Sequence, residues 1–149
     1  MNKFYLLKKP LLVTATVMLF FSIAQAQQSK ITLTTTKAIG QTVSLGINAA
    51  IADQPNIWID LDNDGIKDAG EQVTAFGASQ TSYTISSQTI TIYGNVTTLY
   101  CYGNSLTALD VSQNVNLTML YCPYGQLTAL NVGQNVNLIS IICGDNQLT

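Results

Sequence analysis

The stretch that decides the fold is VTTLYCYGNSLTALDVSQN, residues 96–114, which returns as LTMLYCPYGQLTALNVGQN at residues 117–135. A partial third copy, LISIICGDNQLT, covers residues 138–149. The copies follow the frame LxxLxCxxNxLxxLxVxxN, and their cysteines recur every 21 residues. A fixed period of this length means that each copy builds one structural unit, which buries its apolar side chains by stacking on the next.

A leucine frame with a period in the twenties is typical of a leucine-rich repeat. Each copy predicts a short strand, near residues 99–101, 120–122 and 141–143, whose alternate side chains point into a shared core. Parallel stacking of these strands would align equivalent side chains in ladders. We therefore expect a short leucine-rich-repeat solenoid of about 2.5 repeats over residues 95–149, without a C-terminal cap.

Two polar columns and a cysteine column follow from the same period. Cys101, Cys122 and Cys143 are expected as small buried side chains, and a disulfide between neighbours is the alternative that parallel Cβ vectors fit poorly. The side chains of Asn104 and Asn146 can satisfy backbone groups at the turn, which Gly125 between them cannot. We expect the middle repeat to be the loosest there, with water or a shifted loop supplying the missing bonds. Asn114 and Asn135 predict a second column of this kind.

The segment before the repeats reads as a small antiparallel β domain. ITLTTT, TVSLGIN and TITIYG alternate apolar and polar residues, and turn residues separate them. This pattern predicts about six short strands between residues 30 and 94. The fold class is therefore mainly β: a β cap domain over residues 27–94, followed by the repeats. We expect the last cap strand, near residues 89–93, to cover the open edge of the first repeat.

An acidic loop lies inside this cap domain, in NIWIDLDNDGIKDAGEQV. Residues 60–71 match the calcium-loop pattern D-x-[DN]-x-[DN]-G-x5-E in full. Calcium takes six to eight oxygen ligands. The flanks, IWI and QVTAF, look like strands, so we expect a strand-borne structural calcium site rather than a helical hand. The alternative is a solvated turn whose aspartates bond their own backbone. The predicted ligands are the side chains of Asp60, Asp62, Asp64, Asp68 and Glu71 and the carbonyl of Ile66.

Side chains that point out of the repeat strands form a candidate contact face. Tyrosine combines a wide apolar ring with a hydroxyl, which suits recognition of proteins or sugars. Stacked aromatic side chains that only stabilise the sheet are the alternative. The predicted partner-binding residues are Tyr100, Tyr102, Tyr121 and Tyr124. The other side chains expected on this face are Thr98, Met119, Pro123, Ser140, Ile142 and Gly144.

The first 26 residues have the pattern of an export signal. Lysines precede an apolar run at residues 11–23, and AQA at residues 24–26 is a small-x-small cleavage site. The apolar run is short for a membrane anchor, and no later segment could span a bilayer. We therefore expect cleavage after Ala26 and a secreted or cell-surface protein without a membrane span in its mature chain.

Composition narrows the function further. The chain has 149 residues, 47% of them hydrophobic and 9% charged, a balance that favours a folded domain. After cleavage three lysines would face eight acidic residues, a formal charge of −5, which excludes a basic nucleic-acid surface. The chain has no histidine and no arginine, and its acids are too close together along one loop for a glycosidase pair. We expect no enzyme.

The segments NVTTLYCYGNSLTALDVSQNVNLTMLYC, ITLTTTKAIGQTVSLGINAA and IWIDLDNDGIKDAGEQVTAFG resemble leucine-rich-repeat surface proteins exported by Bacteroidota. The repeats are similar to the internalin-like, internalin J type with its Cys ladder. This resemblance implies an exported, non-catalytic binding protein that recognises a protein or glycan, or acts in adhesion, at the cell surface. The alternative is a truncated N-terminal fragment of a longer adhesin or repeat-bearing hydrolase, without independent binding.

Overall fold

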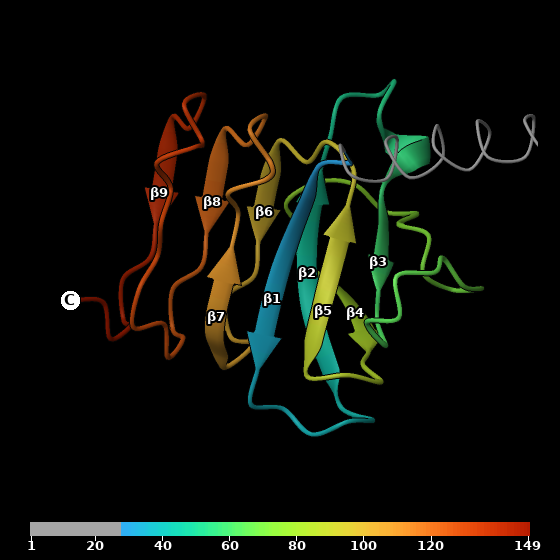
Figure 1. Cartoon of the computed structure of the whole chain (residues 1–149), viewed down its shortest axis with the longest axis horizontal. Coiled ribbons are helices and arrows are strands. Elements are labelled where there is room, and N and C mark those ends of the chain that lie inside the picture. Colours follow the sequence, from blue (N-terminus) through green and yellow to red (C-terminus); the bar gives the residue numbers. More distant parts are fainter. Residues whose placement is uncertain (1–27) are drawn as a thin grey trace, which may run out of the picture.

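The structure, a computed structural model, describes residues 28–149. The predicted signal peptide, residues 1–26, lies outside the described residues. Within them the chain forms nine strands and one short 3-10 helix (Figure 1). The elements are β1 (Lys30–Thr35), β2 (Thr42–Asn48), η1 (Gln54–Asn56), β3 (Trp58–Asp60), β4 (Thr81–Thr84), β5 (Thr89–Tyr93), β6 (Thr98–Tyr100), β7 (Leu106–Asp110), β8 (Met119–Tyr121) and β9 (Ser140–Ile142).

The strands form two sheets that enclose one core. The four-stranded sheet has the order β3-β5-β1-β7, and the five-stranded sheet has the order β4-β2-β6-β8-β9. Figure 1 looks onto the first sheet, with β2 and β4 of the second behind it. The first sheet is antiparallel, whereas the second combines antiparallel and parallel pairs. The predicted fold class, mainly β, is confirmed at this level.

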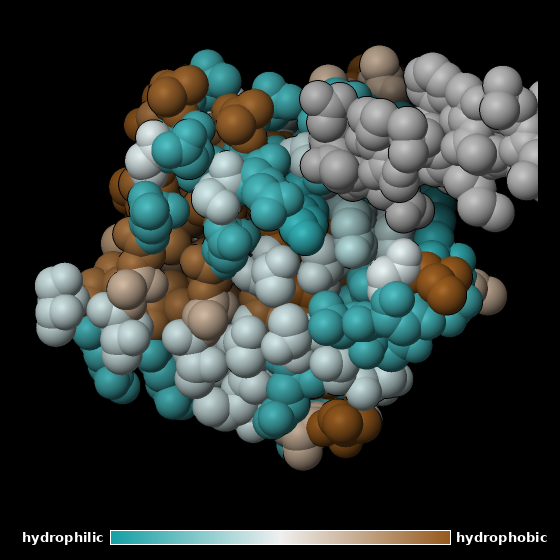
Figure 2. Space-filling model, viewed as in Figure 1, coloured by the Kyte–Doolittle hydropathy of each residue, from teal (hydrophilic) through white to brown (hydrophobic). Residues whose placement is uncertain are grey.

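The three repeat strands pair in parallel with the register that the repeat period predicts. Leu99 lies opposite Leu120, and Leu120 lies opposite Ile141, so paired residues are 21 positions apart. Leu99 and Leu120 are fully buried, whereas Ile141 is 41% exposed. Ile141 is exposed because no further strand of the described chain covers β9. Apolar side chains accordingly gather toward the β8–β9 end of the molecule, on the left in Figure 2.

The two predicted segments, residues 27–94 and 95–149, share both sheets. β7 comes from the second segment and pairs with β1, while β2 comes from the first and pairs with β6. The expectation that the strand near residues 89–93 (β5) covers the first repeat is wrong. β5 cannot pair with β6 because β1 and β3 already occupy its two edges, so β2 covers the first repeat instead.

Other local expectations also differ from the structure. Five strands, rather than about six, precede residue 94 in the described chain. The segment QVTAF forms no strand and contributes one isolated bridge, between Gln72 and Trp58. Residues 106–110 of the first repeat, outside the three strands expected there, form β7, because β1 offers them an open edge. Among residues 28–149, no helix has the length and apolar character needed to cross a bilayer.

Candidate functional site

The acidic loop begins at the end of β3 and folds back over the four-stranded sheet. Asp60, the last residue of β3, pairs with Thr91 of β5 and is only 1% exposed. Glu71, at the other end of the loop, is 4% exposed, while residues 62–70 between them are exposed. Because buried carboxylates are costly without hydrogen-bond partners, both must be compensated locally.

Backbone N–H groups of the loop supply that compensation. Asp60 accepts from the N–H groups of Asp64, at 3.1 Å, and Gly65, at 2.9 Å. Glu71 accepts from Leu61 at 2.8 Å through one oxygen and from Asp68 at 2.9 Å through the other. The two buried carboxylates therefore fold the loop around themselves. Gly65 has φ +80°, a left-handed conformation that favours glycine, as the calcium-loop pattern requires at this position.

The loop gathers all five predicted carboxylate ligands into two overlapping groups. Each group has carboxylate oxygens within 4.8 Å of one another, and Asp62 belongs to both. The groups are Asp60, Asp62 and Glu71, and Asp62, Asp64 and Asp68. Each carboxylate oxygen has two lone pairs, so an oxygen that accepts one N–H can still ligate a cation.

The remaining predicted ligand, Ile66, also lies within the loop. Its N–H donates to a carboxylate oxygen of Asp64 at 2.7 Å, a bond between an aspartate and its own loop backbone. Such bonds belong to the solvated-turn alternative as well. Exposed acidic groups often cluster without an ion, so calcium stays a prediction at this site.

The tyrosine face consists of Tyr100, Tyr102, Tyr121 and Tyr124, on the outer side of the five-stranded sheet. Tyr100 and Tyr121 lie opposite each other, with ring centroids 5.7 Å apart and tilted by 45°. Tyr102 meets Tyr121 edge-on, at 5.3 Å and 87°. Tyr124 is 64% exposed. Pro123, which was expected on this face, is buried, because β8 ends at Tyr121 and the strand alternation ends with it.

The cysteine column consists of free thiols, with Cys101 and Cys122 buried and Cys143 half-buried. The prediction of small buried side chains is confirmed for the first two. A hydrogen bond to Cys122, together with burial, raises the pKa of the Cys101 thiol well above its ordinary value. Accepting that bond lowers the pKa of Cys122. The column therefore carries protonated, inward-facing sulfur at Cys101.

The asparagine column satisfies backbone groups as predicted. Asn104 donates to the carbonyl oxygens of Ser44 and Cys101 and accepts from the N–H of Ser44. One amide thus joins the first repeat to β2. In the second column, Asn135 donates to the carbonyl oxygens of Val111 and Asn114, as predicted. The prediction is wrong for Asn114, because its side-chain oxygen accepts only from the hydroxyl of Ser29 and its amide nitrogen is buried without a partner among the described residues.

The expectation of water or a shifted loop at Gly125 is wrong. Asn146 of the third repeat reaches back and donates to the carbonyl oxygen of Cys122 at 2.9 Å, while also donating to Cys143. Its side-chain oxygen accepts from the N–H of Leu127 at 3.1 Å. A methyl group at Gly125 would come within 2.5 Å of that oxygen, so the missing side chain makes room for Asn146.

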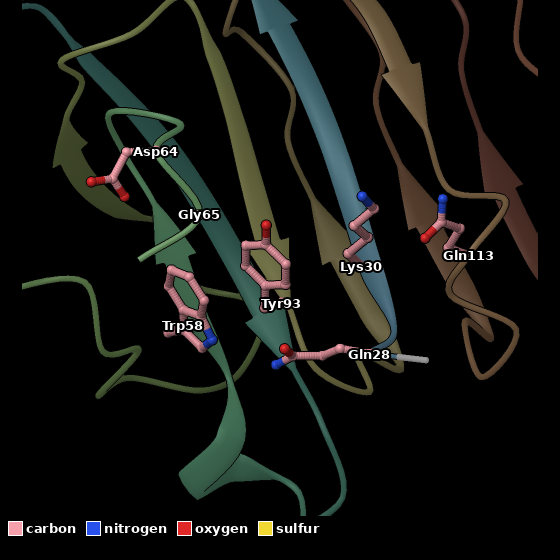
Figure 3. Close-up of a pocket in the computed structure, with 7 residues that line it drawn as sticks. All are labelled: Gln28, Lys30, Trp58, Asp64, Gly65, Tyr93 and Gln113. Atoms are coloured by element: carbon pink, nitrogen blue, oxygen red, sulfur yellow. The ribbon is translucent and has the colours of Figure 1, made fainter. Parts of the chain in front are cut away.

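A cavity that the sequence did not predict lies between the acidic loop and the start of β1 (Figure 3). Its volume is about 370 Å³. The lining residues are Gln28, Lys30, Trp58, Asp64, Gly65, Tyr93 and Gln113. Strand alternation could have shown that Trp58 and Tyr93 point to the same face of their strands. It could not have shown that the two residues are neighbours, because that depends on which strands pair.

No family model matches the chain, and neither does any curated protein or solved structure.

Proposed function

We propose that the chain is an exported, non-catalytic leucine-rich-repeat binding protein that recognises a protein or glycan at the cell surface. The supporting observation is the parallel pairing of β6, β8 and β9 at intervals of 21 residues, which sets the half-buried Tyr100 beside Tyr121 on the outer side of the five-stranded sheet. In this proposal residues 95–149 are an internalin-like solenoid and residues 27–94 are its cap.

The cap role is supported by two strand pairings and one amide. β2 runs antiparallel to β6 and occupies the edge that a preceding repeat would otherwise cover. β1 does the same for β7 on the opposite side of the core. Asn104 then bonds Ser44 of β2 much as Asn146 bonds the repeat before it. Stacked repeats require a cap at each end of the stack. Here β1 and β2 cover the end where a preceding repeat would otherwise pack.

The tyrosine face is the proposed contact surface. Tyrosine side chains offer large contact areas with few rotatable bonds, so ordering them on binding costs little entropy. Tyr102 and Tyr121 hold each other in an edge-on contact, which keeps the face rigid before a partner arrives. Tyr124 makes no aromatic contact among the described residues and is the most exposed of the four, so it is free to meet a partner.

Binding of the fluorescently labelled mature chain to intact bacterial and host cells, and to immobilised glycans, tests this proposal. Replacing Tyr100 and Tyr124 by alanine together should weaken binding at least tenfold, because aromatic anchors carry much of the binding energy of an interface. Ile51→Ala, an exposed apolar change in the turn after β2, is the matched control. Equal binding by the double variant and the control would contradict the proposal.

Calcium binding to residues 60–71 is the second part of the proposal, with a structural role in the cap. Support comes from the five carboxylates that the loop gathers into two overlapping groups. Like charges this close repel one another unless a cation lies between them. The side chains of Asp60, Asp62, Asp64, Asp68 and Glu71 would hold the ion, with the carbonyl of Ile66 as a further ligand.

A further inference from the structure

The cavity floor is a row of three side chains that crosses three strands of the four-stranded sheet. Trp58 of β3 pairs with Tyr93 of β5, and Tyr93 pairs with Lys30 of β1. The next row, Ile59, Ile92 and Ile31, is fully buried in the core. Since successive side chains of a strand point to opposite faces, Trp58, Tyr93 and Lys30 must point to the outer face.

The aromatic part of this floor is pre-formed. The rings of Trp58 and Tyr93 stack with centroids 4.3 Å apart and planes within 13°. Trp58 is 8% exposed, so Tyr93 presents most of the ring surface that a ligand could reach. The hydroxyl of Tyr93 is protonated at neutral pH, as in any tyrosine, and can donate a hydrogen bond to a ligand.

The walls come from three separate parts of the chain. Asp64 and Gly65 of the acidic loop form one side, and Gln113, in the turn after β7, lies on the other (Figure 3). Gln28, just before β1, borders the cavity below Tyr93 in that view. Segments from both halves of the chain therefore meet around one aromatic floor.

The chemistry of the lining favours a neutral ligand rich in hydroxyl groups. Lys30 and Asp64 carry opposite formal charges, so the lining has no net charge unless the acidic loop holds a cation. The side-chain amides of Gln28 and Gln113 each donate and accept hydrogen bonds, as a sugar hydroxyl does. The electron-rich face of an aromatic ring attracts the polarised C–H groups on one side of a pyranose ring.

We propose that this cavity binds the pyranose ring of a neutral sugar, either free or at the end of a glycan. The ring would lie against Tyr93, with its hydroxyls bonded to Lys30, Gln28 and Gln113. A volume of about 370 Å³ lies near the lower limit of ordinary ligand pockets, which suits one sugar unit better than a long chain. The site is on the four-stranded sheet, so it is separate from the tyrosine face of the proposed function.

Saturation-transfer NMR and calorimetry of the mature chain with methyl glycosides of glucose, galactose, mannose and N-acetylglucosamine test the proposal. We expect at least one to bind with Kd on the order of 1 mM, as is reasonable for so small a ligand. Tyr93→Ala should weaken that binding at least tenfold, and Gln113→Ala about threefold. Ile51→Ala, an exposed change in the turn after β2 and outside both proposed binding surfaces, should leave it unchanged.

Three results would overturn the proposal: no transfer from any of the four sugars, undiminished binding by Gln113→Ala and Tyr93→Ala, or binding lost only in Tyr124→Ala. The last result would place the sugar on the tyrosine face and so support the proposed function instead. If Tyr93→Ala fails to fold, Gln113→Ala decides alone, because Gln113 is exposed. A linear tetrasaccharide that binds more tightly than its terminal sugar would identify glycan ends as the source, and equal binding would identify free sugar.

Discussion

At the scale of single residues, Asn146 makes the backbone hydrogen bonds of its own repeat and also bonds that an asparagine at position 125 would otherwise make. It bonds the backbone of its own repeat at Cys143 and that of the preceding repeat at Cys122 and Leu127. Asn104 divides its bonds in the same way between Cys101 and the strand before it. The middle repeat, with Gly125, therefore depends on its successor for bonds that its own side chain cannot make.

Gly125→Ala tests this dependence. The added methyl group would displace the Asn146 side chain and break its backbone bonds, so we expect the free energy of unfolding to fall by about 1 kcal/mol. Urea denaturation measures the change. In the Asn146→Ala background the same substitution should cost much less, because no amide is left to displace. Additive effects of the two changes would contradict the arrangement.

The column of asparagines could be predicted from the sequence. That Asn146 replaces the amide missing at Gly125 could not. A 21-residue period is enough to align Asn104, Gly125 and Asn146 and to infer what the amides bond. Which neighbour replaces a missing amide depends on how closely adjacent repeats approach, and a period carries no such distance. The same limit applies to Pro123, whose burial depends on where β8 ends.

At the scale of elements, the acidic loop shows what a local motif can predict. The spacing of the acidic residues was enough to predict that all five carboxylates lie close together, because all five come from one short segment. Burial of Asp60 and Glu71 could not be inferred in this way. It arises because Asp60 pairs with Thr91, about thirty residues further along the chain, so the loop folds onto β5.

Calcium should stabilise the protein through this loop. We expect added calcium at saturating concentration to raise the melting temperature of the mature chain, because an ion bound only by the folded state shifts unfolding by mass action. Glu71→Gln should reduce calcium affinity at least tenfold, since it removes one buried carboxylate ligand. Differential scanning fluorimetry and calorimetry measure the two effects.

Asp145→Asn is the matched control for the calcium experiment. Asp145 is an exposed acid in the third repeat, and its backbone has φ +53°, which asparagine tolerates. The control should respond to calcium as the unchanged protein does. A melting temperature insensitive to calcium in all three proteins would exclude a structural calcium site.

The contact between β2 and β6 requires a glycine. A methyl group at Gly46 would lie 3.0 Å from the carbonyl oxygen of Ala78 and 3.2 Å from Cβ of Tyr100. Gly46→Ala should therefore lower the free energy of unfolding by about 1–3 kcal/mol, the usual cost of overpacking. Gly144→Ala is the control, since nothing lies near the added methyl group. Equal urea midpoints for the two variants would show that β2 can move away from β6 without cost.

At the scale of the whole molecule, local patterns predicted the elements better than their arrangement. Alternation identified β1, β2 and β5, and the repeat period identified β6, β8 and β9 with their parallel register. The pairing of β1 with β7 and of β2 with β6 was missed, because partners distant in sequence leave no periodic signal. The cavity was missed for the same reason: Trp58, Tyr93 and Lys30 become neighbours only through that arrangement.

Protection from hydrogen exchange should decrease along the repeat strands of the mature chain. Among the strands of residues 28–149, β6 and β8 each have a neighbour on both sides, whereas β9 has only β8. Ile141 is exposed where Leu99 and Leu120 are buried. We expect amides of β6 to exchange most slowly and those of β9 fastest, because exposed edges open at low free energy. Mass spectrometry of exchanged peptides from the three strands measures the order, and slowest exchange in β9 would contradict it.

The central place of β1 has a consequence for biogenesis. It is the first of the nine described strands to be synthesised, yet its partners β5 and β7 arrive much later. Thr32 contacts Thr91 across 59 residues, and Thr34 accepts a hydrogen bond from Thr107 across 73. Such distant pairing closes slowly. A polypeptide with this topology cannot complete its four-stranded sheet until β7 has been made. This order suits the export that we propose, because a narrow translocation channel accepts unfolded chains.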